Sequence, residues 1–200
     1  MLKLYYAPRT RSVRIRWLLE ELGLEHELER VEFRPQASAF AQATPLGKFP
    51  VLADGDTVIA ESGAILEYIL ERYAGGRLAP AVGSPQRGEF LQWVHFAEGT
   101  AFPPLGVMIW HGLYLGNAGE IPQAIDSARE RAHSALAVVE QHLASRDYLL
   151  GAEFSGADIM LGFTLAAAQF LGVLDERYPA TLAYLGRLTE RPAFQRANAD

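Results

Sequence analysis

The stretch GKFPVLADGDTVIAESGAILEYI, residues 47–69, carries the pattern that decides the fold. Two short apolar runs, FPVLAD and TVIA, flank Asp54-Gly55-Asp56, and an Asp-Gly step between such runs is a hairpin turn signal. From Ser62 to Tyr73 the apolar residues recur at helical spacing, and Gly75-Gly76 then ends the pattern. The stretch therefore predicts a β-hairpin that is followed directly by a helix.

The residues before this stretch alternate between strand and helix patterns. LKLYY (2–6) and HELERVEF (26–33) read as strands, and the apolar stripe within 11–22 predicts a helix that Gly23 ends. The order is strand, helix, strand, a looser segment, then the hairpin and its helix. It predicts a small α/β domain with a mixed sheet over residues 1–78.

The chain beyond a linker-like segment, RLAPAVGSP (77–85), has helical patterns only. These patterns cover about 87–115, 123–144, 155–171 and 178–189. Phe102-Pro103-Pro104 is expected to break or kink the first of them, because proline lacks the backbone donor that a helix needs. Ser155 and Asp158 have the spacing of a capping box, which predicts where a buried helix begins. The second domain, residues 86–200, is expected to be all-α.

Composition restricts the class of protein. The chain has 200 residues, a net charge of -6, 50% hydrophobic residues and no cysteine. The acidic balance argues against nucleic acid as a partner. Without cysteine there is no disulfide, thiolate metal site or nucleophilic protein thiol, and the histidines show no metal-ligand spacing, so no metal is expected. No apolar run reaches about 18 residues and the N-terminus is too polar for a secretory signal, so a cytoplasmic protein without membrane contact is expected.

Glu61 and Ser62 stand where the helix of the opening stretch begins. Ser62 is placed to cap that helix, but Ile65 occupies the position from which a capping-box side chain would return. Exposed amides at the positive end of a helix attract an anion, and the neighbouring Glu61 attracts a cation. A ligand with a carboxylate and an ammonium on one carbon would match both groups. The alternative is a capped helix beside a solvated glutamate.

Pro50 opens the first strand of the hairpin. A cis bond between Phe49 and Pro50 would turn the Phe49 backbone outward, so that its N–H and C=O could pair with an extended peptide. Only about 5–6% of X-Pro bonds in folded proteins are cis, and a trans proline at a strand start is the alternative. The hypothesis is therefore a peptide-binding edge beside the helix start.

In order and spacing, these pieces resemble the cytosolic glutathione transferases along nearly the whole chain. The matching pieces are GKFPVL, AESGAILEYI, LYYAPRTRSVRIRWLLEELGL, RLAP and FSGADIML, although Thr44 stands where many relatives carry Asn. The resemblance implies a thioredoxin-like first domain, a homodimer and glutathione as the co-substrate. It also implies roles for the residues that would bind the tripeptide: Pro50 as the cis-proline, Lys48 and Phe49 beside the peptide, and Glu61 and Ser62 at its γ-glutamyl end.

Glutathione chemistry needs a thiolate, and an ordinary thiol with a pKa near 8.5 is only about 3% ionised at pH 7. Lowering that pKa by two units takes roughly 2.7 kcal/mol, which matches one hydrogen bond to a charged group, about 1.5–3 kcal/mol. Family members place this donor after the first strand. Thr10 is the first candidate here, Ser12 the second and Tyr5 the third, with helix capping as the alternative for the two hydroxyls.

Four arginines, Arg9, Arg11, Arg14 and Arg16, form a basic cluster next to this loop, and such a cluster could steer an anionic peptide. Arg11 is expected to contact the ligand, while two of the four are expected on a solvated helix face. Arg34 is expected to meet the glycyl carboxylate.

An apolar second substrate needs an apolar pocket near the sulfur. Four side chains close to the expected kink are the candidates, with core packing as the alternative for each: Phe102, Met108, Trp110 and Tyr114. The leading hypothesis is conjugation of glutathione to a small hydrophobic electrophile. A glutathione-dependent disulfide or peroxide reductase is the second, and a non-catalytic binding module on the same scaffold is the third.

Overall fold

The computed structural model describes residues 1–31, 44 and 47–199. The chain divides into two compact units, Met1–Leu78 with Glu190–Asp200, and Ala79–Thr189. We call these the α/β unit and the helical unit. Among the described residues, no helix combines the length and the apolar character needed to cross a membrane.

The α/β unit is built on a four-stranded sheet in the order β2-β1-β3-β4. The strands are β1 (Leu2–Tyr6), β2 (His26–Arg30), β3 (Val51–Asp54) and β4 (Thr57–Ala60). Strand β1 runs parallel to β2 and antiparallel to β3, and β3 is antiparallel to β4. The predicted mixed sheet and hairpin are therefore confirmed.

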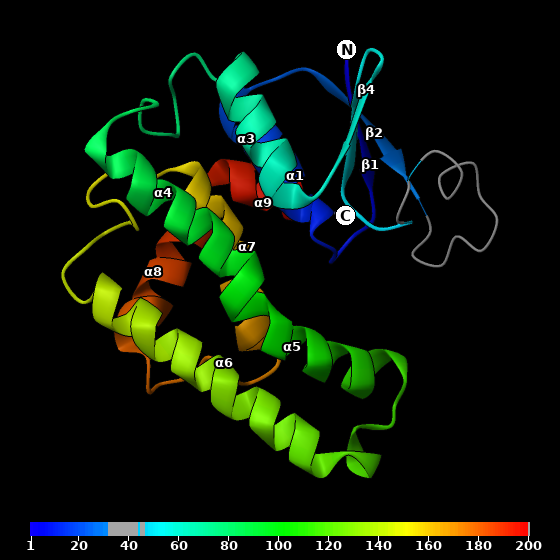
Figure 1. The fold of residues 1–200 in the computed structure, drawn as a ribbon, viewed down its shortest axis with the longest axis vertical. Helices are drawn as coiled ribbons and strands as arrows, with labels where there is room; N and C mark the ends of the chain where they lie inside the picture. The colour runs from blue at the N-terminus through cyan, green and yellow to red at the C-terminus, as the bar shows by residue number, and fades with distance from the viewer. Residues whose placement is uncertain (32–43, 45–46, 200) are drawn as a thin grey trace. The chain divides into compact units, whose positions relative to one another are not determined.

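Helices α1 (Ser12–Leu22) and α3 (Ser62–Tyr73) pack against each other and against the sheet (Figure 1). Along β1 buried residues alternate with half-buried ones, so that Leu2, Leu4 and Tyr6 form one face of the strand. Helix α3 has the bounds that the sequence predicts, because its apolar stripe is complete within that range.

A short helix that the sequence did not predict, α9 (Pro192–Asn198), packs against α1. The Phe194 ring meets Trp17 edge to face at 4.9 Å between centroids. The Arg191 guanidinium donates to both carboxylate oxygens of Glu21, at 2.6 and 2.8 Å. The last segment of the chain, which the sequence places in the helical domain, thus packs in the α/β unit because an aromatic contact and a bidentate ion pair bind it there.

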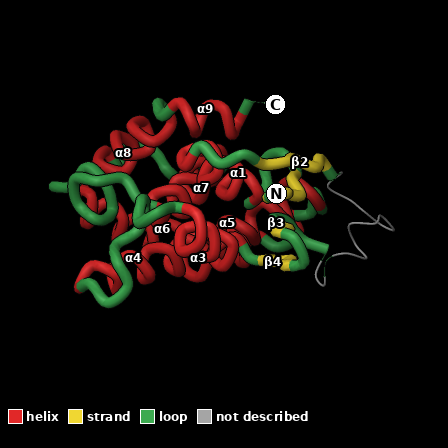
Figure 2. The backbone as a smooth tube through the Cα atoms, turned by 90° about the horizontal axis from the view of Figure 1, so that it is seen from above, coloured by secondary structure: helices red, strands yellow, loops and turns green. Residues whose placement is uncertain are grey.

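The helical unit contains no β-strand between residues 79 and 189, all of which the structure describes (Figure 2). Its helices are α4 (Pro85–Phe96), the π-helix η1 (Ala97–Ala101), α5 (Phe102–Ile109), the π-helix η2 (Trp110–Tyr114), the short 3-10 helix η3 (Ala118–Glu120), α6 (Pro122–Leu143), α7 (Gly156–Phe170) and α8 (Pro179–Thr189). The helical run continues through Pro103 and Pro104, where a break or kink is the sequence expectation. Because η1 changes the hydrogen-bond register just before them, the prolines lie in the first turn of α5, where a missing donor costs little.

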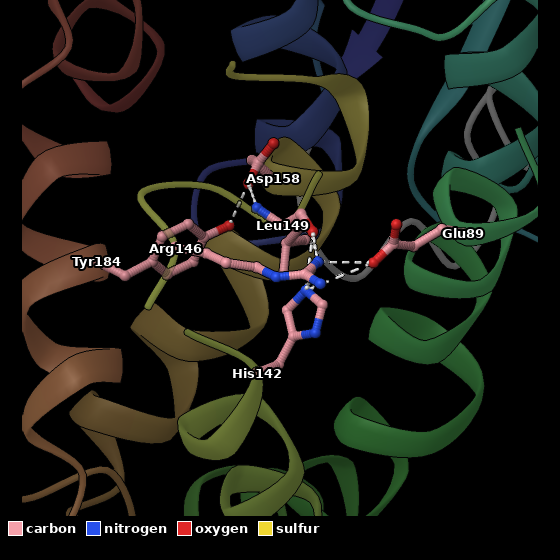
Figure 3. A network of polar contacts seen from close by, with 6 residues as sticks. All are labelled: Glu89, His142, Arg146, Leu149, Asp158 and Tyr184. Atoms are coloured by element: carbon pink, nitrogen blue, oxygen red, sulfur yellow. Dashed lines mark hydrogen bonds and ion pairs between the residues drawn. The ribbon is translucent and has the colours of Figure 1, made fainter. Parts of the chain in front are cut away.

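The capping box at the start of α7 is confirmed. The amide and the hydroxyl of Ser155 both donate to Oδ2 of Asp158, each at 2.8 Å. The other oxygen, Oδ1, accepts from the Leu149 amide at 2.9 Å and from the Tyr184 hydroxyl at 2.7 Å (Figure 3). Burial raises the pKa of Asp158, while these four donors favour its charged form. This cluster connects three segments of the helical unit and is structural.

Candidate functional site

The loop after β1 brings two candidate hydroxyls together. Thr10 Oγ1 and Ser12 Oγ lie 2.7 Å apart, and the Ser12 amide donates to Thr10 Oγ1 at 3.3 Å. Both hydroxyls also donate to the Ala7 carbonyl, at 2.7 Å from Thr10 and 2.9 Å from Ser12. The Ala7 amide donates back to Ser12 Oγ at 3.2 Å. The loop is therefore a closed hydrogen-bond cluster centred on one carbonyl.

The two hydroxyls differ in exposure. Ser12 is fully buried, whereas Thr10 is half-buried at the outside of the cluster. A hydroxyl has one proton and two lone pairs. The Ser12 proton therefore goes either to the Ala7 carbonyl or to Thr10 Oγ1, and the Thr10 proton goes to Ala7 unless it turns away. If Ser12 donates to Thr10 Oγ1, which also accepts from the Ser12 amide, the Thr10 proton can leave the Ala7 carbonyl and turn toward a ligand. The arrangement can thus present one well-supported hydroxyl donor.

Tyr5 lies on the opposite face of β1 from Leu4 and Tyr6, because side chains alternate along a strand. It is half-buried, and the Lys3 ammonium lies 5.4 Å from the centroid of its ring. Strand pairing places Tyr5 opposite Val51 of β3.

The start of α3 differs from the sequence expectation in one respect. Glu61, not Ser62, is the N-cap residue, and the first helical bond runs from the Ile65 amide to the Glu61 carbonyl at 2.9 Å. Within the described residues, no side chain caps this helix end. The first-turn amides are therefore available to an anion, as the helix dipole favours.

Glu61 adopts φ 71° and ψ 116°, a left-handed backbone that a residue with a β-carbon rarely takes. Such a conformation costs about 1–3 kcal/mol and is found mostly at functional sites. The Glu61 side chain is exposed beside the helix start. The sequence rules placed Ser62 at the cap because they assume a relaxed backbone at residue 61.

Ser62 contacts an arginine that the sequence analysis did not single out. Arg14 Nη1 on α1 donates to Ser62 Oγ at 3.1 Å, and both residues are buried, with 0% and 2% of their surface exposed. The sequence does contain a signal of this burial, because Arg14 lies three and four residues before Trp17 and Leu18, on the apolar stripe of its helix. Of the other arginines, Arg9 is exposed, and Arg11 and Arg16 are half-buried.

The Phe49–Pro50 peptide bond is cis, as predicted. Pro50 is buried directly before β3, Phe49 is half-buried and Lys48 is exposed. Arg34 lies outside the described residues, so its predicted contact with a glycyl carboxylate stays a prediction.

The four side chains expected near a second substrate divide into two pairs. Phe102 and Met108 are buried in the helical unit, and the Phe102 ring stacks on Phe163 at 6.1 Å between centroids. Trp110 and Tyr114 are exposed by 53% and 37%, with their rings 5.7 Å apart. The first pair packs in the core, and only the second pair offers apolar surface to a ligand. Within the described part of the chain, no group of three or more His, Asp or Glu residues is placed to hold a metal ion.

The order β1-α1-β2 followed by β3-β4-α3, with a cis-proline before β3, defines a thioredoxin-like domain, and an all-helical domain follows it. Two family models match this chain: "Glutathione S-transferase, N-terminal domain" over residues 1–71 and "Glutathione S-transferase, C-terminal domain" over residues 122–187. The chain belongs to the glutathione S-transferase family.

Individual relatives agree with this assignment. The chain is 33% identical to glutathione S-transferase 3 of Zea mays, over 99% of this chain and 93% of that protein. The crystal structure of a glutathione transferase from Methylococcus capsulatus superposes with a TM-score of 0.88 at 29% identity, covering 99% of this chain and 97% of that one. A family member from Pseudomonas fluorescens, solved with two glutathione molecules bound, gives a TM-score of 0.87 at 27% identity, covering 98% and 92%.

Proposed function

We propose that this protein binds glutathione, holds it as the thiolate and transfers it to a small hydrophobic electrophile. The observation that carries the proposal is the half-buried Thr10 hydroxyl, which Ser12 supports with two possible hydrogen bonds. A hydrogen bond from a neutral hydroxyl to a charged sulfur is worth about 1.5–3 kcal/mol, and this is the size of the pKa shift that glutathione needs.

The remaining site residues bind and orient the peptide in this proposal. The first-turn amides of α3 and the Ser62 hydroxyl bind the α-carboxylate of the γ-glutamyl group, and Glu61 pairs with its ammonium. The Phe49 backbone beside Pro50 pairs with the extended peptide. Three basic side chains attract its carboxylates: Arg11, Arg34 and Lys48. The thiol proton leaves to solvent, and Thr10 donates its hydrogen bond to the resulting thiolate.

In the transfer step, the thiolate attacks an electrophilic carbon. A C–S bond forms while a halide leaves with its electron pair, or the thiolate adds to an activated double bond whose carbanion then takes a proton from water. The exposed Trp110 and Tyr114 offer apolar surface to the electrophile. We include in the proposal a homodimer and a cytoplasmic location, which the family resemblance favours. Light scattering should then give twice the mass of one chain.

A disulfide or peroxide reductase is the second candidate, and one relative favours it. The Pseudomonas fluorescens family member holds two glutathione molecules, which is the stoichiometry that forms one glutathione disulfide. Because this chain has no cysteine, both electrons would come from two glutathione thiolates, which are oxidised to the disulfide while the substrate disulfide or peroxide is reduced.

The test compares wild-type protein with Thr10→Ala, Thr10→Ser and Ser12→Ala. Calorimetry measures glutathione binding, and turnover is measured with a chloronitrobenzene and with hydroxyethyl disulfide. Thr10→Ala should lower the thiolate fraction of bound glutathione, read from its ultraviolet absorbance, by about tenfold. Thr10→Ser, which keeps a hydroxyl, should retain most of the thiolate fraction of the wild type. Binding without turnover of either substrate would favour a non-catalytic module, and unchanged thiolate in Thr10→Ala would refute the role of Thr10.

A further inference from the structure

Arg16 connects helix α1 to the end of strand β1, just before the loop that carries the candidate hydroxyls. Its Nη1 donates to the Tyr6 hydroxyl at 3.2 Å, and its guanidinium lies over the Tyr6 ring at 5.1 Å from the centroid. Tyr6 is the last residue of β1, and only 3% of its surface is exposed. Because a guanidinium has only donors and a buried phenol usually finds a partner, the contact suits both groups.

Arg16 and Ser12 lie four residues apart, on the same face of α1. Ser12 Oγ accepts from the Ala7 amide at 3.2 Å and lies 2.9 Å from the Ala7 carbonyl. Arg16 reaches Tyr6, the residue directly before Ala7. One contact fixes a point, whereas two contacts a helical turn apart fix a direction. Ser12 and Arg16 together therefore set the tilt of the start of α1 against the end of β1.

The last segment of the chain supports this contact from α9. Phe194 of α9 packs against Trp17, the residue next to Arg16, with ring centroids 4.9 Å apart. The Ala199 carbonyl, directly after α9, accepts from Arg16 Nη2 at 3.4 Å. The Arg16 side chain thus joins α1, which carries it, to the end of β1 and to the end of α9.

The direction of the Thr10 hydroxyl depends on the same strand end and the same helix start. Its oxygen lies 2.7 Å from the Ala7 carbonyl, which follows β1, and 2.7 Å from Ser12 Oγ, at the first residue of α1. A change in the tilt of α1 moves Ser12 relative to Ala7, so that Thr10 turns or loses one of these contacts. Hydrogen bonds weaken steeply with misalignment, so a small movement changes what Thr10 can donate to.

We propose that Arg16 is a positioning residue for Thr10: by holding the end of β1 against α1, it keeps the Thr10 hydroxyl directed at the sulfur of bound glutathione. The inference rests on the proposed function, in which Thr10 donates to the thiolate. Arg16 is not among the residues that bind the peptide in that proposal. Its effect should therefore fall on the ionisation of the thiol and on kcat, while the binding of the protonated peptide changes little.

The test measures the thiolate fraction of bound glutathione from its ultraviolet absorbance, with the Kd from calorimetry and kcat for a chloronitrobenzene. Arg16→Met keeps the apolar stem without the guanidinium, Arg16→Lys keeps a charge without the planar fork, and Tyr6→Phe keeps the ring without the hydroxyl. Arg77→Met is the matched control, because Arg77 also donates to α1, but at its far end, to the Leu22 carbonyl at 3.0 Å.

Arg16→Met should lower the thiolate fraction at about pH 7, and kcat with it, by about threefold, since the hydrogen bond to the sulfur is weakened. The Kd at about pH 5.5, where the thiol stays protonated, should remain within about twofold of the wild type. Arg16→Lys and Tyr6→Phe should give smaller decreases in the thiolate fraction, and Arg77→Met none. A merely structural role for Arg16 would lower the Tm without changing the thiolate fraction of the folded protein, which would overturn the inference.

A double variant separates positioning from a direct effect of the Arg16 charge. If Arg16 acts through Thr10, adding Arg16→Met to Thr10→Ala should not lower the thiolate fraction further, because residues that act as one unit are not additive. A further decrease would mean that the charge acts on the sulfur directly, and it would overturn the inference.

Circular dichroism identifies any variant that does not fold. If Arg16→Met is unfolded, Arg16→Lys and Tyr6→Phe decide, and a wild-type thiolate fraction in both overturns the inference. A decrease in Thr10→Ala without any decrease in Arg16→Met would overturn the inference alone. Wild-type protein that binds no glutathione, or an unchanged thiolate fraction in Thr10→Ala, would overturn the proposed function and the inference with it.

Discussion

Replacing Glu140 by Gln should destabilise the helical unit, because this carboxylate caps α8 from the side of α6. One oxygen, Oε2, accepts from the Thr181 amide at 2.8 Å and from its hydroxyl at 2.7 Å. The other, Oε1, accepts from the Ala180 amide at 2.9 Å. A glutamine has a single oxygen, so if it stays on Thr181, its NH₂ group faces the Ala180 N–H donor to donor.

The magnitude follows from these contacts. One charge-assisted hydrogen bond is lost, which is worth about 1.5–3 kcal/mol. The negative charge at the N-terminal end of α8 is also lost, at about 0.3–1 kcal/mol. We therefore expect Glu140→Gln to lower the free energy of unfolding by about 2–4 kcal/mol near pH 7. Glu130→Gln is the control: Glu130 is an exposed residue of the same helix, and its replacement should change the free energy by less than about 0.5 kcal/mol.

The effect of Glu140 should also depend on pH. Burial raises the pKa of Glu140, but hydrogen bonds from the Ala180 amide and from the Thr181 hydroxyl and amide outweigh it, so the net pKa is below the ordinary 4.5. Because the folded pKa is the lower one, this stabilisation is fully present above the unfolded pKa and is lost as pH falls through the folded pKa.

Urea unfolding followed by circular dichroism, with the wild type and both variants at about pH 7 and about pH 3.5, measures the two effects. The difference between the wild type and Glu140→Gln should be smaller at the lower pH. A Glu140→Gln variant as stable as Glu130→Gln near neutrality would refute the capping argument. A difference that does not change with pH would refute the role of the charge.

Two further titrations test other polar contacts. Burial is the main cause that lowers the pKa of His133, and the Arg177 guanidinium is the second. As pH drops below about 6.5, the unfolded chain takes up a proton before the folded chain does, so the Tm should fall. His133→Gln should flatten this decline, and a flat wild-type profile would contradict the reasoning. The hydrogen bond from the Tyr73 hydroxyl is the main cause that lowers the pKa of Asp54, so Tyr73→Phe should raise that pKa toward 3.8 in a carbon NMR titration, and an unchanged value would rule Tyr73 out as the cause.

The parts of the fold that the sequence predicts are those with local signals. The hairpin around Gly55 and the helix Ser62–Tyr73 follow from turn chemistry and periodicity, since both lie within a few residues of their own determinants. The start of α7 follows from the Ser155 and Asp158 pair for the same reason. The short helix α9 was missed because its stability comes from α1, and the Arg191–Glu21 pair that joins them spans 170 residues of sequence.

The candidate site was predictable in composition but not in geometry. Residue type and spacing suggested Thr10, Ser12 and Ser62, and the structure gives each of them a specific hydrogen-bond environment. Only coordinates separate a fully buried Ser12 from a half-buried Thr10. The burial of Arg14 was missed because a charged residue beside an apolar stripe is normally assumed to reach solvent, and Ser62, to which it donates, lies 48 residues away.

Two helix starts in this chain, those of α7 and α3, differ in how completely they are capped. At α7, Ser155 and Asp158 close the helix end, and every oxygen of the carboxylate has its donors. At α3, the N-cap Glu61 has a left-handed backbone and no capping side chain among the described residues, and a buried Arg14 donates to Ser62 where an apolar contact would be less costly. The left-handed backbone of Glu61 costs free energy, and the burial of the Arg14 guanidinium carries a desolvation cost. Both departures from local rules meet at one helix end, while the other helix end obeys the rules, and the glutathione that we propose to bind at α3 would account for both together.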